Sequence, residues 1–347
     1  MALRPRASET AAQRRGSLLL LARGLRFGAA WVQGKQALGV PAREFAGALC
    51  RGSRPHFFVY SAAATLAGAG AARGHELRVG LAALSAAFAW GVGQLLNDLS
   101  DLEGDSVDAP DRPAVQGLLP DGPTSLVVTC GGLLVTLAFA LLHPFGVLLA
   151  FGSGLLLLVY SAAKRWPLLG NVAHGALMAL LGVIGGAMAS PTEPLPAVFA
   201  QSAGSAALLG GVGALYLQGN YEKDRVGDAR AGNRTLSHVL GIRGSAALRA
   251  VGAILLFVAA VRLGHVSSSL ALSVLTGSLA LHLVSALVAF RGGTDGAALR
   301  GYRASVHAAA LAYLALGSAF LGDVGLAVAV VSSAAVIEVA FARSANP

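Results

Sequence analysis

Two short segments of the chain concentrate acidic and amide side chains with the spacing of a shared chemistry. The first contains Asn97, Asp98, Asp101 and Asp105, and the second contains Asn220, Asp224 and Asp228. Spacings of three to four residues place such side chains along one face of a helix. Crowded carboxylates repel one another unless a hard cation lies between them, and oxygen ligands favour magnesium or calcium.

The spacing favours Mg²⁺ bound together with a diphosphate. Magnesium keeps several waters and binds through a few carboxylates plus phosphate oxygens. A calcium loop would need glycine where Ser106 stands. The non-functional alternative is that these residues are solvated loop ends that cap helices. It is disfavoured because the pattern occurs twice, each time directly after an apolar run, and charged groups at the end of a membrane span are usually functional. The predicted metal ligands are Asp98, Asp101, Asp105, Asp224 and Asp228.

Long apolar runs must position these segments. Of 347 residues, 55% are hydrophobic and 12% charged, with a mean hydropathy of +0.66, which excludes a water-soluble globule. Runs of about 20 apolar residues match the thickness of a bilayer core, and their Ala, Gly and Leu content favours packed helices over a barrel. We therefore predict an all-α, polytopic transmembrane bundle with candidate spans at 56–72, 79–96, 124–142, 145–163, 168–190, 196–219, 244–264, 267–290, 303–321 and 324–341.

The distribution of basic residues predicts the orientation of the bundle. Ten of the 26 Lys and Arg precede the first span, and most others fall in loops on the same side. Counting Arg249 and Arg303 with the loops is a choice, and the predicted orientation does not depend on either. Membrane topology thus explains the net charge of +9, and no nucleic-acid partner is expected. Four spans separate the acidic segments, so both should face the cytoplasm of an inner or plasma membrane and could form one site.

The chain is expected to divide into a basic N-terminal extension, residues 1–50, and a transmembrane domain, residues 51–347. In the extension, Arg15, Arg23, Arg26 and Lys35 alternate with apolar runs, which indicates an amphipathic surface segment. A cleaved signal peptide is the competing interpretation. It is disfavoured because arginines interrupt the apolar stretch and no small-residue cleavage pattern follows. The two cysteines are too far apart in sequence to suggest a disulfide framework or zinc site.

Several motifs, in order, resemble the UbiA superfamily of intramembrane prenyltransferases. They are Asn97-Asp98-x-x-Asp101-x-x-x-Asp105, Asp111-Arg112-Pro113 with Gly117, Tyr160-x-x-x-Lys164, Asp224-x-x-x-Asp228 and the stretch from Thr235 to Gly241. The resemblance runs from about Arg54 to Gly241. It implies a helical bundle around a lipid-accessible cavity, with magnesium and a prenyl diphosphate under a cytoplasmic cap. The chain departs from the family pattern at Asn220, where many members have Asp, and in showing ten spans where nine are typical.

The resemblance implies Mg²⁺-dependent transfer of a prenyl group from an isoprenoid diphosphate to a lipophilic or aromatic acceptor within the membrane. Metal would act as a Lewis acid, and basic residues would stabilise the leaving diphosphate. Tyr160 is either a substrate contact or an interfacial anchor. The residues expected to bind substrate are Arg54, Asn97, Arg112, Tyr160, Lys164 and Asn220, and those expected to act in catalysis are Asp98, Asp101, Lys164 and Asp224.

Two rival functions stay open. Phosphoribosyl transfer to a polyprenyl phosphate, within the same superfamily, also uses magnesium and a diphosphate. A cation transporter would place carboxylates near the membrane midplane, where only Glu338 is found. The acceptor depends on cavity shape, which the motifs do not reveal. Four isolated histidines within spans are expected to be satisfied packing residues, namely His56, His174, His282 and His307.

Overall fold

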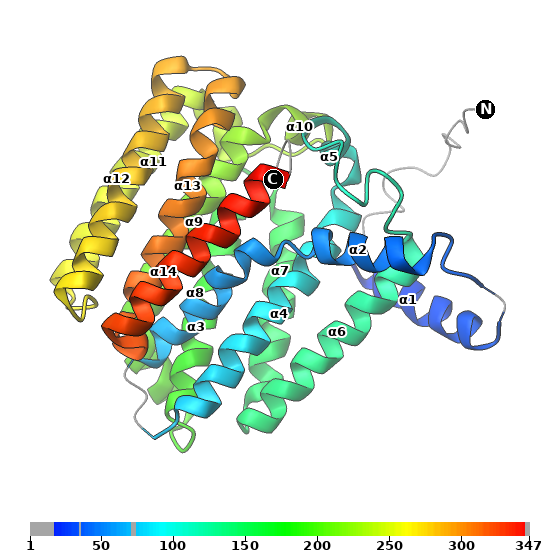
Figure 1. Cartoon of the computed structure of the whole chain (residues 1–347), viewed down its shortest axis with the longest axis horizontal. Helices are drawn as coiled ribbons and strands as arrows, with labels where there is room; N and C mark the ends of the chain where they lie inside the picture. The colour runs from blue at the N-terminus through cyan, green and yellow to red at the C-terminus, as the bar shows by residue number, and fades with distance from the viewer. Residues whose placement is uncertain (1–16, 35, 71–73, 344–347) are drawn as a thin grey trace.

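The computed structural model describes residues 17–34, 36–70 and 74–343 (Figure 1), and all regular structure in these ranges is helical, as predicted. The elements are α1 (Ser17–Val32), α2 (Ala42–Gly52), the 3-10 helix η1 (Pro55–Phe57), α3 (Phe58–Ala69), α4 (Glu76–Ser100), α5 (Leu102–Asp108), α6 (Asp121–Leu142), α7 (Gly146–Ala163), α8 (Leu169–Ala189), α9 (Leu195–Lys223), α10 (Arg225–Arg230), α11 (Leu236–Arg262), α12 (Ser269–Gly292), α13 (Asp295–Leu316) and α14 (Ser318–Arg343).

Each of the ten expected spans falls on a helix, but in the described ranges eight helices are long and apolar enough to cross a membrane. The other two expected spans correspond to α3 and α13. Helix α3 has 12 residues, too few to cross a core of about 30 Å alone. Helix α13 has 22 residues and carries Asp295, Arg300 and Arg303. The expected count of nine or ten spans is therefore not confirmed.

Large apolar side chains cover the outer faces of the long helices. On α6 and α7, Leu134, Leu141 and Leu148 are all more than half exposed, and on α14 Val324 is 81% exposed. Water-soluble monomers rarely expose apolar surface so extensively, whereas hydrocarbon is a suitable environment for it. The protein is an integral membrane protein.

Small residues let the central helices approach closely. Helix α8 packs against α3, α7 and α9. At the α8–α9 contact, a Cβ on Gly175 would lie only 2.8 Å from the carbonyl oxygen of Gly210. Gly68 of α3 and Gly182 of α8 make a similarly close contact. These contacts are of the small-residue type predicted from the Ala and Gly content of the spans.

The two N-terminal helices lie against the outside of the bundle. Helix α1 packs along α6, where Arg23 Nη1 is 3.5 Å from Asp121 Oδ2. Helix α2 contacts α4 and buries Phe45 and Ala48. Residues 1–16 and Lys35 of the expected amphipathic extension lie outside the described residues, and its boundary at residue 50 stays a prediction.

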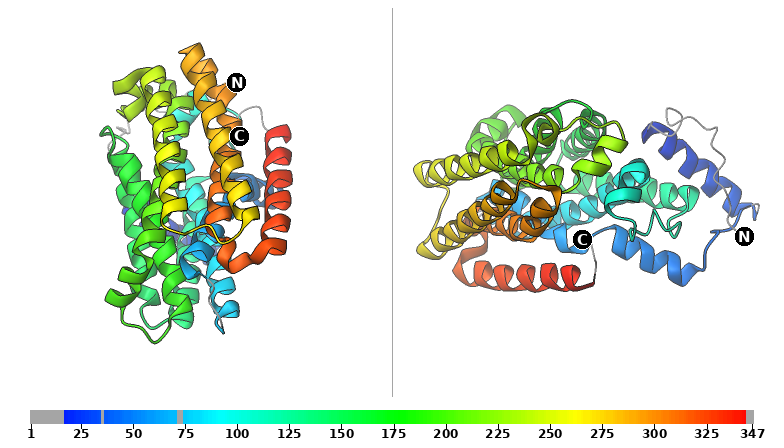
Figure 2. Two further views of the ribbon diagram at one scale, coloured as in Figure 1. Left: turned by 90° about the vertical axis from the view of Figure 1, so that its left-hand side faces the viewer. Right: turned by 90° about the horizontal axis from the view of Figure 1, so that it is seen from above.

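The short helices α5 and α10 pack against each other at one end of the bundle, which we call the motif end (top of Figure 1). The long helices run from this end toward the opposite one (Figure 2). The polypeptide thus returns to the motif end after α4 and again after α9. This arrangement brings the two acidic segments together, while the side of the membrane that they face stays a prediction.

Candidate active site

Each acidic segment crosses the end of a long helix. Asp101 separates α4 from α5 with φ −103° and ψ 11°, and Asp224 separates α9 from α10 with φ −94° and ψ 15°. Backbone hydrogen bonds of 2.9 Å still link Asp105 N to Asp101 O and Asp228 N to Asp224 O. The continuous helix expected from the spacing is therefore interrupted at its middle aspartate. In both segments a long helix thus ends, and a short helix begins, at the middle aspartate.

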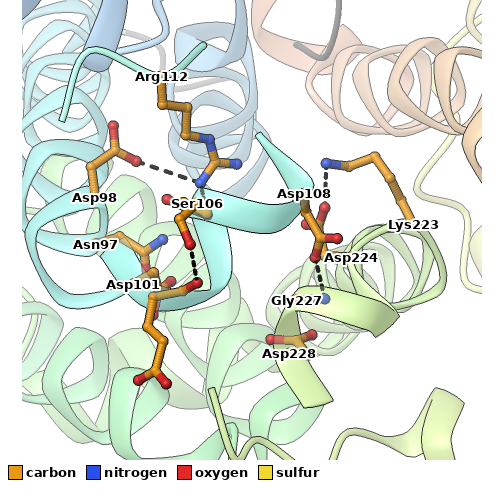
Figure 3. A network of polar contacts seen from close by, with 12 residues as sticks. Asn97, Asp98, Asp101, Ser106, Asp108, Arg112, Lys223, Asp224, Gly227 and Asp228 are labelled. Atoms are coloured by element: carbon orange, nitrogen blue, oxygen red, sulfur yellow. Dashed lines mark hydrogen bonds and ion pairs between the residues drawn. The ribbon is translucent and has the colours of Figure 1, made fainter. Parts of the chain in front are cut away.

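Two glycines allow the short helices α5 and α10 to approach each other closely. The backbone N–H of Gly227 on α10 donates a hydrogen bond of 2.7 Å to Asp108 Oδ2 on α5 (Figure 3). A Cβ on Gly227 would lie 2.6 Å from the carbonyl oxygen of Gly104, so a larger residue would force the helices apart. Asp108 therefore links the first segment to the second directly.

Two arginines pair with the first acidic segment. Arg54 pairs with Asp98, which is only 1% exposed, and Arg112 pairs with Asp105. Arg112 Nη1 also lies 3.9 Å from Asp98 Oδ1. Arg54 has φ 50° and ψ 65°, a left-handed conformation that is strained for a non-glycine residue. Arg54 directly precedes Pro55. From this strained backbone position its side chain reaches the buried carboxylate of Asp98.

Lys164 is the third cation of this segment and follows the last residue of α7. It pairs with Asp101, and its Nζ donates to Asn97 Oδ1 at 3.1 Å. Nζ also lies 5.0 Å from the centre of the Tyr160 ring. Burial alone would lower the pKa of Lys164, but Asp101, Tyr160 and Asp228 together raise it. Lys164 therefore stays charged beside the cavity.

The second acidic segment has fewer cations. Lys223 Nζ lies 2.5 Å from Asp224 Oδ1, and Asn233 Nδ2 donates to Asp228 Oδ1 at 3.0 Å. Burial opposes the charge on Asp224, but Lys223 and Arg112 outweigh it and lower the pKa of Asp224. Burial raises the pKa of Asp228 to about 7, even though Lys164 acts in the opposite direction. Figure 3 shows Lys223, Asp224 and Asp228 across from the first segment.

The donor set fits a hard cation. Two carboxylate oxygens, Asp98 Oδ2 and Asp105 Oδ2, are buried without a hydrogen-bond partner. Burial raises the pKa of Asp105 and of Asp108 to about 6, with nearby carboxylates adding to the effect. Within the described ranges, no three His, Cys, Asp or Glu side chains converge closely enough to hold a metal by themselves. A metal here would need further oxygens from its ligand, which is how Mg²⁺ binds with phosphates.

A cavity of about 750 Å³ begins at the acidic segments and continues between the long helices. This size lies within the usual range for ligand pockets. Its mouth is polar, whereas Trp90, Phe139, Phe151 and Leu155 are among the side chains that line the remainder. Phe151 and Leu155 are also 68% and 51% exposed. The cavity therefore reaches the apolar outer surface of α7.

The cavity wall contains ten of the eleven predicted site residues, including Tyr160 and Asn220. Asp98 is the exception, because it is buried behind the wall and is paired with Arg54, which does line the cavity. The sequence-based grouping of these side chains is thus reproduced in space. Their individual roles in binding and catalysis stay predictions.

The model of the UbiA prenyltransferase family matches residues 57–306, which is most of this chain. The chain belongs to this family. The predicted resemblance to the UbiA superfamily is confirmed.

Two relatives in sequence are named digeranylgeranylglyceryl phosphate synthase. The one from Methanoculleus marisnigri is 31% identical over 160 residues, which are 44% of this chain and 53% of the relative. The one from Methanospirillum hungatei is 28% identical over 170 residues, covering 47% and 57% of the two chains. The chain thus spans little more than half the length of these curated relatives.

Solved UbiA homologues share the fold. The apo structure of a homologue from Aeropyrum pernix has a TM-score of 0.64 and 20% identity, covering 77% of this chain and 97% of its own. A homologue from Archaeoglobus fulgidus, solved with GPP and Mg²⁺, has a TM-score of 0.54 and 16% identity, covering 85% and 98%. At these identities the likeness shows the fold alone.

Sequence reasoning missed several residues at the site of this UbiA-family chain. They all line the cavity and are Asp108, Tyr216, Lys223, Asn233 and Tyr302. Asp108 and Lys223 adjoin the acidic motifs, so position alone could have identified them. Tyr216 lies one helical turn before Asn220, so its position could also have identified it, whereas Tyr302 is far from the motifs in sequence and carries no local signal.

A buried ion pair next to the second motif was also missed. Arg249 Nη2 and Nε donate to Glu222 at 2.8 and 3.2 Å, and both residues are 1% exposed. Ser245 donates to the same carboxylate at 2.9 Å, and Arg249 Nη1 donates to Ser285 at 2.8 Å. We call these four residues the brace, because they join α9 to α11 and α12. The assignment of Arg249 to a loop was wrong, since it lies inside α11.

Three of the four histidines expected to be satisfied packing residues have one ring nitrogen without a hydrogen-bond partner among the described residues. These buried atoms are His56 Nε2, His174 Nε2 and His282 Nδ1. His307 Nε2 lies 2.5 Å from Oε1 of Glu338, the isolated mid-span carboxylate. That carboxylate is therefore paired within the bundle.

Proposed function

We propose that this protein transfers a prenyl group from an isoprenoid diphosphate to a lipophilic or aromatic acceptor within the membrane. The observation that carries the proposal is the placement of three cations, Arg54, Arg112 and Lys164, at the mouth of a largely apolar cavity. A molecule with a multiply charged head and a hydrocarbon tail complements both parts. The names of the sequence relatives are consistent with such a substrate.

We propose Mg²⁺ as the cofactor. The residues that would hold it, together with diphosphate oxygens, are Asp98, Asp101, Asp105, Asp224 and Asp228. Bound there, Mg²⁺ would act as a Lewis acid that improves diphosphate as a leaving group. The structure of the Archaeoglobus fulgidus homologue with GPP and Mg²⁺ supports this choice.

The residues of the chain would act by stabilising charge separation. Arg54, Arg112 and Lys164 would bind the diphosphate where negative charge grows as its bond to carbon breaks. The apolar cavity would keep water from the allylic cation. The described serines of the cavity wall, Ser61 and Ser153, donate to backbone carbonyls, so neither is activated by a base. Ionisation of the substrate therefore fits the site better than covalent catalysis.

The decisive experiment measures turnover of the full chain in lipid nanodiscs. Labelled prenyl diphosphates of several lengths are supplied with Mg²⁺ and a lipid extract. We expect a prenylated lipid to form, and a substrate fluorinated at carbon 2 to bind comparably but react far more slowly, because fluorine disfavours the cation. Equal rates for the two substrates would exclude rate-limiting ionisation. Turnover with phosphoribosyl diphosphate alone would establish the rival reaction.

We propose further that the motif end faces the cytoplasm, because most basic loops lie on that side. Single cysteines introduced as Asp108→Cys and Arg230→Cys, with Cys50 and Cys130 replaced by serine, report on the two segments separately. An impermeant thiol reagent should label both in inside-out vesicles and neither in right-side-out vesicles. Labelling of the two positions from opposite sides would end the shared-site hypothesis.

A further inference from the structure

At the end of the bundle opposite the motif end (bottom of Figure 1), two buried nitrogens lack hydrogen-bond partners among the described residues. They are Nη1 of Arg78, in the first turn of α4, and Nε2 of His143, between α6 and α7. His143 is only 2% exposed. Burial lowers the pKa of His143 and the charge of Arg78 lowers it further, so the two side chains lie close together. Buried polar groups nearly always have a partner, so this pair calls for a ligand or water.

Both unpartnered nitrogens are hydrogen-bond donors. The backbone N–H of Phe145 donates to Nδ1 of His143 at 3.1 Å, so the neutral ring carries its proton on Nε2. The guanidinium of Arg78 can only donate. The ligand that satisfies the pair is therefore an acceptor, and an anion would also balance the positive charge of Arg78.

Among the described residues, no carboxylate pairs with Arg78. Glu76 is the nearest in sequence, but it is exposed and accepts a hydrogen bond of 3.0 Å from the backbone N–H of Gly74. Residues two apart on a helix do not face each other. An arginine that only snorkels at the end of a span keeps its guanidinium in water, whereas Nη1 of Arg78 is buried. The balancing anion must therefore come from outside the described chain.

The surface around the pair is apolar and faces outward. Leu77 directly precedes Arg78 and is 78% exposed, and Leu141, two residues before His143, is 79% exposed. From these two positions, a stripe of exposed apolar side chains follows each of the neighbouring helices α4 and α6 toward the motif end. Such stripes suit acyl chains, so a ligand of the pair can have both an anionic group and hydrocarbon chains. The stripes consist of Leu77, Leu81, Leu84 and Phe88 on α4 and of Leu134, Leu137 and Leu141 on α6.

We propose that Arg78 and His143 bind the phosphate group of a membrane phospholipid in the leaflet away from the motif end, with its acyl chains along the stripes of α4 and α6. Phosphate oxygens accept readily from a guanidinium, and phosphate is the anion that phospholipids place at the end of a membrane span. The site is separate from the cavity, whose wall contains neither residue. It adjoins the cavity through Phe139, a wall residue whose carbonyl accepts from His143 N at 3.0 Å. Lipid binding should therefore stabilise the ends of α4 and α6 behind the cavity.

The first test compares three probes on the full-length protein, delipidated in an uncharged detergent without phosphate buffer. The probes are phosphatidylglycerol, diacylglycerol with the same acyl chains, and inorganic phosphate. We expect phosphatidylglycerol to raise the thermal midpoint by about 3 °C or more, because a ligand that binds only the folded state stabilises it, and the other two probes to shift it by less than about 1 °C. Equal stabilisation by diacylglycerol would assign the effect to acyl chains alone. Equal stabilisation by inorganic phosphate would assign it to a free anion, and either result would overturn the proposal.

The second test locates the bound phosphate with variants. Arg78→Gln removes the charge, and His143→Asn removes Nε2 while keeping an acceptor for the N–H of Phe145. Arg262→Gln is the matched control, because Arg262 is exposed and lies at the same end of the bundle, in the last turn of α11. Native mass spectrometry of the monodisperse protein counts the bound phosphatidylglycerol. We expect each site variant to retain one lipid fewer than the unaltered protein, and the control to retain the same number.

The count is taken on folded protein only, so a variant of lower stability still reports on the site. If Arg78→Gln yields no folded protein, His143→Asn decides alone. Equal counts in the site variants and the unaltered protein would overturn the proposal and leave water as the partner of the two donors. A loss in Arg262→Gln as large as in the site variants would also overturn it, because the lipids would then respond to net charge. Neither test depends on prenyl transfer, so failure of the proposed function leaves both tests intact.

Discussion

The two acidic segments share a backbone plan but anchor their helices differently. In the first, the most buried carboxylate, Asp98, is paired with Arg54 of the cavity wall, so its anchor belongs to the site. In the second, the buried carboxylate is Glu222, and its partner Arg249 belongs to the brace and not to the wall. In the first segment, one ion pair therefore both anchors the helix and contributes to the site. In the second segment, Glu222 anchors the helix and other residues line the cavity.

The cations follow the same division. Arg54, Arg112 and Lys164 come from three separate parts of the chain and all pair with the first segment. The second segment receives Lys223, its own neighbour in sequence, while Asp228 bonds to an amide. The two segments therefore have a similar backbone conformation but different cation partners. We expect the first segment to bind both metal and diphosphate, and the second to bind mainly metal.

The largest effect should come from Glu222→Gln, which leaves Arg249 buried without a full counter-charge. Removing one partner of a buried pair costs about 3–5 kcal/mol. The thermal midpoint in detergent should fall strongly, and the activity of the protein that stays folded should persist. Replacing both partners, Glu222→Leu with Arg249→Met, should recover much of the stability. Unchanged stability of Glu222→Gln would show that the brace does not hold α9.

Asp98→Asn and Asp224→Asn should each reduce turnover more than a hundredfold, because each removes charge from a predicted metal ligand. The loss is on the order of removing a strong electrostatic partner of the transition state. Asp121→Asn is the matched control, since its carboxylate is 58% exposed at the start of α6. Near-normal turnover of both site variants, with magnesium still required, would mean that other residues bind the metal.

A smaller effect is expected from Lys164→Met, and a smaller one still from Lys223→Met. A hydrogen bond to a charged group contributes about 1.5–3 kcal/mol, so loss of Lys164 should raise the KM for the diphosphate at least tenfold. Loss of Lys223 should change the KM only a few-fold, because Lys223 pairs with the second segment, which we expect to bind mainly metal. Steady-state kinetics at saturating Mg²⁺ measure both. Equal increases in KM would contradict the division of tasks between the segments.

The smallest effect should come from Asp108→Asn. The amide oxygen can still accept from Gly227 N, so the contact between α5 and α10 survives while one negative charge near Asp224 is removed. We expect turnover within a few-fold of the unaltered protein. The apparent affinity for Mg²⁺, measured by titration of activity, reports the lost charge. A hundredfold loss of turnover would make Asp108 a metal ligand rather than a link between helices.

Sequence patterns predicted the helical regions and the acidic segments because both signals are local. Apolar runs and the spacing of Asp101, Asp105, Asp224 and Asp228 can be read within windows of about 20 residues. The break of each helix at its middle aspartate was not predicted, since periodicity alone gives no helix end there. Nor was the approach of α5 to α10, although Gly104 and Gly227 were visible in the motifs.

Contacts between distant residues were beyond the sequence patterns. Glu222 and Arg249 are 27 positions apart, and nothing local to either one shows that they pair. The rarity of charge within spans could still have drawn attention to Arg249, which was counted with a loop instead. Likewise, the lack of partners at His174 Nε2 and Trp90 Nε1 depends on the packing of α4 against α8.

The exposed cavity residues Phe151 and Leu155 have a consequence for how rates should be expressed. A ligand dissolved in the bilayer can approach this opening by lateral diffusion, without passing through water. Its effective concentration is then its mole fraction among the surrounding lipids. Adding inert lipid at constant total substrate dilutes such a ligand and lowers the rate, while changing the aqueous volume has no effect on it. Kinetic constants for a ligand that enters the cavity in this way should therefore be expressed per unit of membrane surface.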